Sequence, residues 1–407
     1  MSNGGIAMKK LANLFLCLFL LTAILGIAAE LQHPFLNLPF FSTLEQITWL
    51  ICLATATLVY LGMGFNRHLP KIVLIPLFLW LWWKLIGYWP LENLLGDSFR
   101  LYAAGGQLLF GLAILSLNKQ LNRKSLFLVR SQFSGPPFSG SNLLRFCLIS
   151  LPVVPITLLL ISYSFVGQLI DVNTGGFVQL KPNGLYLTER IYRQGEKHIR
   201  LTGMIHLGQE DFYSELIESL DGSRTLILAE GVSDNDGRLK EHFSYGKIAD
   251  LLGLESQEKI SFPGRVIESL DADDSDHRDG PDILRADIDL NQFDPRTLEV
   301  LNALAKYVLN SDSLTEGYLE FNRWAQDHIS DDLEEVIMND LINKRNRAVI
   351  SYLPKALKRY DTIVIPWGAL HMQGIEAMVK KRGFRLEESH SRLSIDFLLL
   401  PYEKIWE

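Results

Sequence analysis

Five long apolar runs fill the first 170 residues of the chain. They span Leu11–Ala29, Ile47–Gly64, Ile72–Trp89, Leu101–Leu117 and Phe146–Val166. A helix needs roughly 20 apolar residues to cross the hydrocarbon core of a bilayer, and each run comes close to that length. The pattern therefore predicts a transmembrane region of about five helices over residues 1–170, in contact with membrane lipid.

Basic residues fall in alternate connections between these runs. Those connections hold Lys9, Lys10, Arg67, Lys71, Lys119, Arg123, Lys124, Arg130 and Arg145. The others hold Glu30, Glu45, Glu92 and Asp97, with Arg100 as their one base. Because Lys and Arg collect in cytoplasmic loops, this predicts a multi-pass cell-membrane protein with an extracytoplasmic C-terminal domain. The first run, with Gly26 and Ala28 near its end, also fits a cleaved signal peptide, which would not change that side.

Shorter apolar runs in residues 171–407 predict a soluble α/β domain. Paired strands are expected over 174–198, and Thr225–Ala229 and Thr362–Ile365 have the short, continuous apolar character of buried strands. Helical spacing is found in Asp211–Leu220, Leu333–Leu341 and Ile375–Gly383. Strands alternating with helices predict a mainly parallel sheet built from two strand–helix repeats, with a variable middle near 255–330.

Charge separates the two halves of the chain. Residues 1–170 carry 11 Lys/Arg and 4 Asp/Glu, a net charge of +7; the remainder carries 28 and 42, a net charge of −14. An acidic soluble domain argues against nucleic-acid binding, which needs a basic surface. The three cysteines, Cys17, Cys52 and Cys147, all lie in the first half. The second half therefore has no thiol for a disulfide, a zinc site or a nucleophile.

An acidic loop in the middle of the soluble half has two interpretations. It contains His277 and the acids Asp271, Asp273, Asp274, Asp276, Asp279 and Asp282. A calcium site is one interpretation, but Asp276 stands where a calcium-binding EF-hand loop needs glycine. A solvated loop is favoured, because like charges repel and stay hydrated.

Two segments of the soluble half share one motif. In each, an apolar strand is followed by Gly-x-x-His and then a helix; the motifs run from Gly203 to His206 and from Gly368 to His371. We expect each glycine to permit a tight chain reversal. Glu230 ends the strand Thr225–Ala229 in the same way. Parallel strands would bring His206, Glu230 and His371 to one sheet edge, where α/β sheets bind ligands.

A third Gly-x-x-His and two aspartates also lie in the soluble half of the sequence. A third Gly-x-x-His, from Gly195 to His198, precedes a strand in a polar turn and is interpreted as accidental. Asp287 and Asp289, expected on a strand, are candidates for an additional ligand, although strand acids often face solvent.

These residues resemble the TraB/Tiki (TraB/GumN) family of the erythromycin-esterase/ChaN-like superfamily. The resemblance rests on TGMIHLG, ILAEGV, RNRAVISYL and IPWGALHMQGIEAMVKKRGF, over roughly 197–232 and 340–390. It implies metal-binding or catalytic roles for His206, Glu230 and His371, structural glycines at Gly203 and Gly368, and a role for the pair Arg345–Asn346. Pro366 and Trp367 depart from the small or aliphatic residues common there. Family members include membrane-tethered metal-dependent proteases, an esterase and a haem-binding protein.

The chemistry of this residue set predicts hydrolysis. Two imidazoles and a carboxylate suit Mn, Co or Zn, whose bound water attacks an amide or ester. We therefore expect a membrane-anchored metal-dependent hydrolase, most simply a peptidase acting on peptide or protein. Arg345 would steady Glu230 or hold a substrate carboxylate. The alternatives are a metal-independent, esterase-like hydrolase with a histidine as general base, and a non-enzymatic membrane protein that binds or senses metal or haem.

Overall fold

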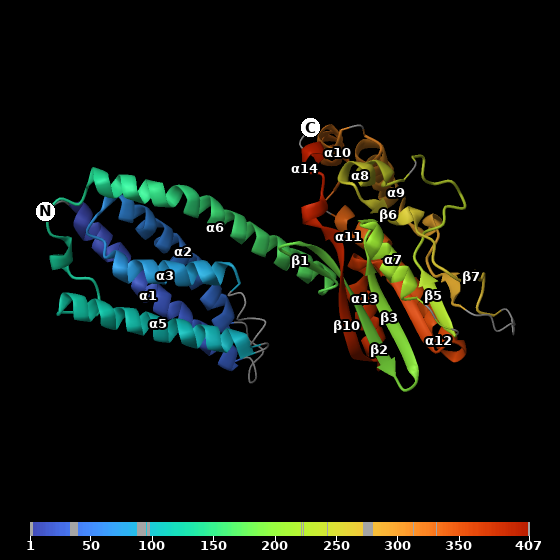
Figure 1. The fold of residues 1–407 in the computed structure, drawn as a ribbon, viewed down its shortest axis with the longest axis horizontal. Coiled ribbons are helices and arrows are strands. Elements are labelled where there is room, and N and C mark those ends of the chain that lie inside the picture. Colours follow the sequence, from blue (N-terminus) through green and yellow to red (C-terminus); the bar gives the residue numbers. More distant parts are fainter. Residues whose placement is uncertain are drawn as a thin grey trace. The chain divides into compact units, whose positions relative to one another are not determined.

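The chain forms two compact units, residues 1–166 and 167–407 (Figure 1). The computed structural model describes residues 3–32, 40–87, 95, 98–220, 222, 224–241, 243–271, 280–311, 313–330 and 332–405. The first unit is helical, and the second is built on a mixed β-sheet. Each unit is described separately below.

The first unit contains five principal helices. They are α1 (Asn3–Gln32), α2 (Phe40–Phe65), α3 (Lys71–Leu85), α5 (Phe99–Asn122) and α6 (Gly140–Thr174), which continues into the second unit. Four of them, all except α3, are long and apolar enough to cross a membrane. The third expected run thus forms a helix of 15 residues, shorter than the sequence suggested. Trp89, the end of that run, lies outside the described residues.

The basic segments of the sequence lie together at one end of this helical bundle. Near the start of α1, Asn13 exchanges hydrogen bonds with Leu128 in the α5–α6 connection, at 3.1 and 2.9 Å. After α2, the Arg67 amide donates to the Pro137 carbonyl of the same connection at 2.9 Å. The opposite end holds the ion pair between Lys84 and Glu45, at 2.9 Å. Helix α3 therefore runs from the basic end towards the other, although it is short.

The second unit is organised around an eight-stranded sheet. Its order is β1-β2-β3-β9-β5-β8-β7, with β10 also paired to β2. Pairing is parallel from β3 through β9, β5 and β8 to β7, and antiparallel among β1, β2, β3 and β10. The strands are β1 (Val178–Lys181), β2 (Gly184–Gln194), β3 (Lys197–Met204), β5 (Thr225–Ala229), β7 (Arg265–Val266), β8 (Asp282–Arg285), β9 (Thr362–Gly368) and β10 (Arg385–Asp396). The expected α/β domain with a mainly parallel sheet is confirmed.

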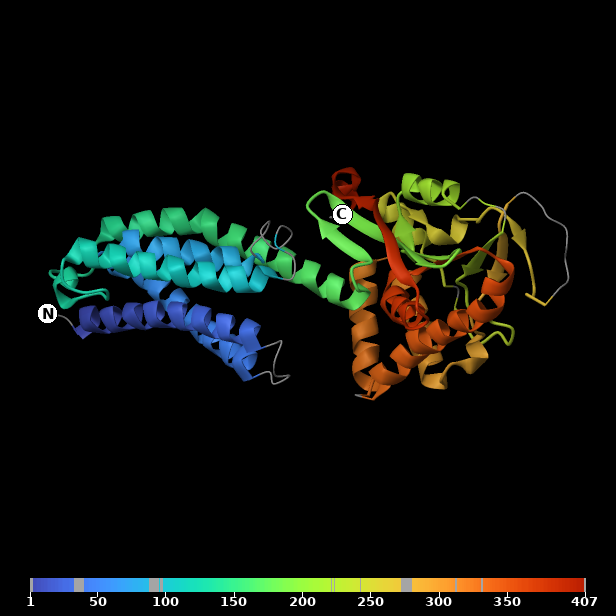
Figure 2. The same ribbon diagram turned by 90° about the horizontal axis from the view of Figure 1, so that it is seen from below.

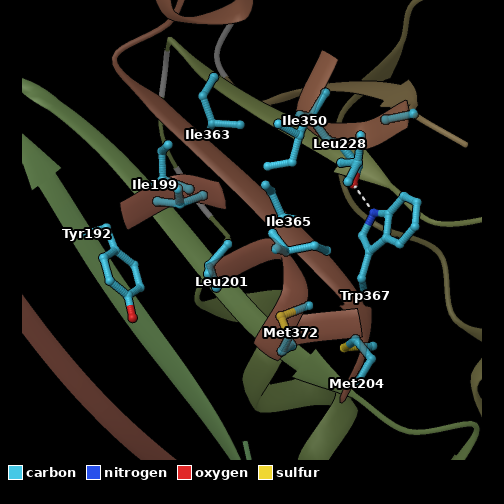
Figure 3. Packing of buried hydrophobic residues seen from close by; sticks show 14 of the residues in the cluster. Tyr192, Ile199, Leu201, Met204, Leu228, Ile350, Ile363, Ile365, Trp367 and Met372 are labelled. Carbon is cyan, nitrogen blue, oxygen red and sulfur yellow. Dashed lines mark hydrogen bonds between the residues drawn. The ribbon is translucent and has the colours of Figure 1, made fainter. Parts of the chain in front are cut away.

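Both faces of the central strands are buried. Ile363, Ile365 and Trp367 of β9 belong to the main core cluster, whereas Val364 packs with Leu220 and Ile227 in a second cluster. Successive side chains of a strand point to opposite faces, so burial on both sides explains the uninterrupted apolar runs. Figure 3 shows the main cluster around β9.

Three helices pack against the main core, and the last two of them carry polar residues described below. They are α7 (Glu210–Glu218), α12 (Arg345–Arg359) and α13 (Ala369–Lys381), and each contributes buried side chains to the main core. A π-helical turn, Asn339–Lys344, joins α11 (Leu333–Met338) to α12. Both views show α12 and α13 beside the sheet (Figures 1 and 2). The helix expected over Leu333–Leu341 thus continues much further, through α12.

Further elements complete the unit, three of them in the segment expected to be variable, near 255–330. They are β4 (Leu207–Gly208), α8 (Gly246–Leu252), β6 (Glu255–Ser256), α9 (Pro295–Leu304), α10 (Leu314–His328) and α14 (Tyr402–Ile405). Most of the acidic loop, 272–279, lies outside the described residues, and with it Asp273, Asp274, Asp276, His277 and Asp279. Its flanking acids form ion pairs: Asp271 with Lys355 at 3.0 Å and Asp282 with Arg265 at 2.9 Å.

Candidate functional site

Four parallel strands end at the same edge of the sheet and present polar residues there. Residue Met204 of β3 is in register with Gly368 of β9, and Ala229 of β5 with Arg285 of β8. His206, His371, Glu230 and Asp287 therefore follow the carboxyl ends of β3, β9, β5 and β8, in that spatial order. This is the edge at which the sequence predicted a site.

Glu230 is held by both of its carboxylate oxygens. The amide of Gly368 donates to Oε2 at 2.6 Å, and Nη2 of Arg345 donates to Oε1 at 2.7 Å. The side chain is only 12% exposed, so these charge-assisted bonds offset much of the cost of its burial. Glu230 is thus fixed at the strand end as an ionised carboxylate.

The two motif glycines do not act as the sequence suggested. Neither Gly203 nor Gly368 has a left-handed backbone conformation, so backbone torsion does not require glycine at either position. A Cβ at Gly368 would lie 3.5 Å from the His371 ring and 3.6 Å from Oε2 of Glu230. A Cβ at Gly203 would press on the Thr188 carbonyl at 3.2 Å. Gly368 instead keeps the space between imidazole and carboxylate open.

Arg345, the first residue of α12, contacts the other three polar side chains of the cluster. Nε donates to Oδ1 of Asp287 at 3.0 Å, and Nη2 donates to Oδ2 of the same residue at 2.7 Å and also to Glu230. Nη1 faces Nε2 of His371 at 3.3 Å and the Leu341 carbonyl at 3.5 Å. The guanidinium therefore has an acceptor for each of its five N–H groups. It steadies Glu230, and the resting arrangement leaves no donor for a substrate carboxylate.

His371 presents a lone pair to this cluster. Asn346 donates through Nδ2 to the His371 carbonyl at 3.3 Å, which turns its Oδ1 towards Nδ1 of the ring at 2.7 Å. Because an amide oxygen only accepts, Nδ1 carries the proton, and the lone pair of Nε2 accepts from Nη1 of Arg345 at 3.3 Å. Nε2 lies 3.5 Å from Oε1 of Glu230. The structure thus brings two of the three expected residues together.

Burial keeps His371 uncharged. Desolvation lowers its pKa from 6.5 to about 4; Arg345 adds to the depression, and Glu230 and Asp287 oppose it. The ring also meets the buried Trp367 edge to face, with centroids 5.2 Å apart. A neutral imidazole at physiological pH is suited to accept a proton or to bind a metal ion.

His206 lies apart from this pair. Its exposed ring stacks on Tyr245, with centroids 4.6 Å apart and planes within 8°. Its carbonyl accepts from the Gln257 amide at 2.9 Å, where β4 pairs with β6. A charge on His206 would still lower the pKa of His371, so the two rings are electrostatically close. The expected meeting of His206 with the other two residues is not found in this conformation.

A metal ion needs several donor side chains arranged around one position. Among the described residues, no three His, Cys, Asp or Glu side chains are arranged to hold one. The position between Glu230 and His371 is approached by the guanidinium of Arg345, at 2.7 and 3.3 Å. The residues as arranged therefore do not fit a bound metal. Mn, Co or Zn at His206, Glu230 and His371 stays a prediction.

Tyr245 and Gly374 were not identified from the sequence, whereas Asp287 was a candidate ligand there. Asp287 lies just after β8 rather than on a strand, and Asp289 accepts from Ser233 Oγ at 2.8 Å. Tyr245 carries no sequence pattern that marks it. Gly374 is close to Asn346: a Cβ there would lie 2.5 Å from Nδ2 of the amide. A glycine three residues after His371 was the one available indication of this close approach.

Searches against family models, curated proteins and solved structures find no match for this chain. The resemblance to the TraB/Tiki family accordingly stays a prediction that rests on the quoted motifs.

Proposed function

We propose that this chain is a membrane-anchored hydrolase that cleaves an ester or amide bond, most simply in a peptide, at the carboxyl edge of its sheet. The observation that carries the proposal is the neutral imidazole of His371, whose Nε2 accepts from Arg345 and lies 3.5 Å from a carboxylate oxygen of Glu230 in a largely buried cluster. A neutral base beside an anion that stabilises its protonated form is the arrangement that general-base catalysis needs.

His371 would take the proton of an attacking water as the oxygen bonds to the substrate carbonyl carbon. Glu230 would stabilise the imidazolium that forms, while Arg345 and the Gly368 amide keep the carboxylate in place. The proton would then pass to the leaving oxygen or nitrogen. His206, which is exposed and follows β3 at the same edge, would contact substrate.

A second candidate is a non-enzymatic membrane protein in which the same cluster is structural or serves binding. It is favoured by one observation: Arg345, Glu230 and His371 satisfy one another's hydrogen bonds in the resting arrangement. In this case the domain would fold normally and turn over no substrate.

Hydrolysis by the purified full-length protein tests the proposal directly. A panel of fluorogenic esters and peptides is offered to the detergent-solubilised chain, with and without EDTA. We expect turnover of at least one substrate class, and retention of that activity in EDTA, because the steps above use only protein groups. No turnover of any ester or peptide by folded protein would favour the second candidate.

The location of the domain is part of the proposal. The basic residues at one end of the helical bundle support a cytoplasmic position for that end. With α3 counted as a pass, α6 starts there at Gly140 and would leave on the opposite side. The domain from residue 167 would then be extracytoplasmic.

A reporter fused after Glu407 tests this topology. Alkaline phosphatase, active only outside the cytoplasm of bacteria, should be active, and green fluorescent protein at the same position should be dark after export in unfolded form. The same pair fused after Lys124, at the basic end, is the matched control and should give the reverse result. Fluorescence from the Glu407 fusion would contradict the proposed orientation.

A further inference from the structure

The side chains around Arg345 form a cation site, and the guanidinium of Arg345 is the cation that occupies it. Oε1 of Glu230 and Oδ2 of Asp287 each lie 2.7 Å from the same nitrogen, Nη2. Nε2 of His371 lies 3.3 Å from the neighbouring nitrogen, Nη1, with its lone pair free to accept. Two carboxylates and one imidazole thus face a single positive group from three different elements.

Burial makes this positive group indispensable. The side chains of Glu230, Asp287 and His371 are 12%, 0% and 5% exposed. Two carboxylates packed this closely without a counter-charge would repel each other and lose hydration. The cluster therefore requires a cation, and the chain supplies it as the guanidinium at the start of α12.

The same three donors are those that a divalent metal ion prefers. Histidine and carboxylate ligands bind zinc or manganese at about 2.0–2.2 Å. The two oxygens now 2.7 Å from Nη2 would need to move by roughly 0.6 Å to reach a metal at that nitrogen's position, and Nε2 of His371, now 3.3 Å from the neighbouring Nη1, would need to move further. We propose that Arg345 stands in the place of a metal ion, and that removing its side chain converts Glu230, Asp287 and His371 into a divalent-metal site.

This inference rests on the contacts of Arg345 and not on the proposed hydrolysis. It accounts for the poor fit of the expected ligand set: His206 is not needed, and Asp287 takes the third position. A folded chain without hydrolytic activity would leave it untouched, because its readout is metal binding.

The test compares metal binding by full-length wild type and Arg345→Ala in detergent. Each protein is incubated with Mn²⁺ or Zn²⁺, dialysed, and analysed for bound metal, and its thermal midpoint is measured with and without the ion. We expect essentially no site-bound metal in the wild type. Arg345→Ala should bind about one equivalent, and its midpoint should rise by roughly 5 °C at saturating metal.

Two controls isolate the site. Arg190→Ala removes another guanidinium from a buried carboxylate, Glu376, 2.7 Å away. The remaining partners of Glu376 are Tyr192 and Lys380, so this variant should gain no metal. The double variant Arg345→Ala with His371→Ala should lose the acquired equivalent. If Arg345→Ala does not fold alone, added metal should restore its folding.

Three results would overturn the proposal. One is a wild type that binds about one equivalent and loses it on His371→Ala, because the position would then accept metal with Arg345 present. Another is a folded Arg345→Ala chain that stays metal-free. The last is an unfolded Arg345→Ala chain that metal does not rescue.

Discussion

Replacing His371 with glutamine is expected to lower the rate of hydrolysis by about 10²- to 10⁴-fold, the usual contribution of a general base. Glutamine is similar in length and can keep a contact with Asn346, but it has no basic lone pair to accept a proton from water. The matched control is His198→Gln, in the third Gly-x-x-His. His198 lies at the opposite end of β3, in register with Thr362 at the start of β9, and should be dispensable. Equal losses in both variants would contradict the role of His371.

The pH profile of the wild type distinguishes a catalytic from a structural His371. The reaction needs the neutral ring, and burial lowers its pKa to about 4. The rate should therefore stay flat as pH falls from 8 to about 5 and decline tenfold per unit only below about pH 4. A decline centred near pH 6.5, the value for an ordinary histidine, would show that a different group is the base.

Trp367→Ala is expected to lower the free energy of unfolding by about 3–5 kcal/mol, the range for removing a large aromatic side chain from a core. The side chain is fully buried in the main cluster, and its Nε1 donates to the Leu228 carbonyl of β5 at 2.8 Å (Figure 3). Its loss would leave a cavity and a Leu228 carbonyl without its hydrogen-bond donor. It would also remove the ring that packs against His371. The change is measured as the shift of the denaturant midpoint of the solubilised chain.

Trp367→Phe separates packing from hydrogen bonding. Phenylalanine fills most of the volume but cannot donate to Leu228, so the expected loss is about 1–2 kcal/mol, the cost of a buried acceptor without a partner. A Phe variant as unstable as the Ala variant would show that the hydrogen bond, and not the volume, dominates. Either result concerns stability and leaves the identity of the base to the His371 experiment.

The local pattern of apolar residues in the sequence predicted most of the fold. Transmembrane helices and doubly buried parallel strands both require uninterrupted apolar runs, so α1, α2, β5 and β9 were visible in the sequence. The long strand β10 was not, because its residues Arg385–Ser391 are exposed and strongly polar. Its pairing with β2 is a contact between segments about 200 residues apart, which no local pattern records.

The sequence predicted the part of the candidate site that depends only on which strands are neighbours. His371 and Glu230 meet because β9 and β5 are neighbours and parallel. His206 stands apart from this pair because the chain after β3 pairs with β6, and its ring stacks on Tyr245. Asp287 reaches Arg345 only because β8 lies beside β5, a fact that depends on the tertiary fold.

The exposed strand β10 has a consequence for how the protein behaves at high concentration. Within the part of the chain that the structure describes, β10 pairs with β2 on one side only. An open strand edge is a template for aggregation between copies, and charged side chains along it discourage that pairing. The exposed run of β10 carries Arg385, Glu387, Glu388 and His390, with ion pairs from Glu387 to Arg193 and from His390 to Glu388. These charged side chains disfavour sheet-to-sheet pairing between copies of the chain at high concentration.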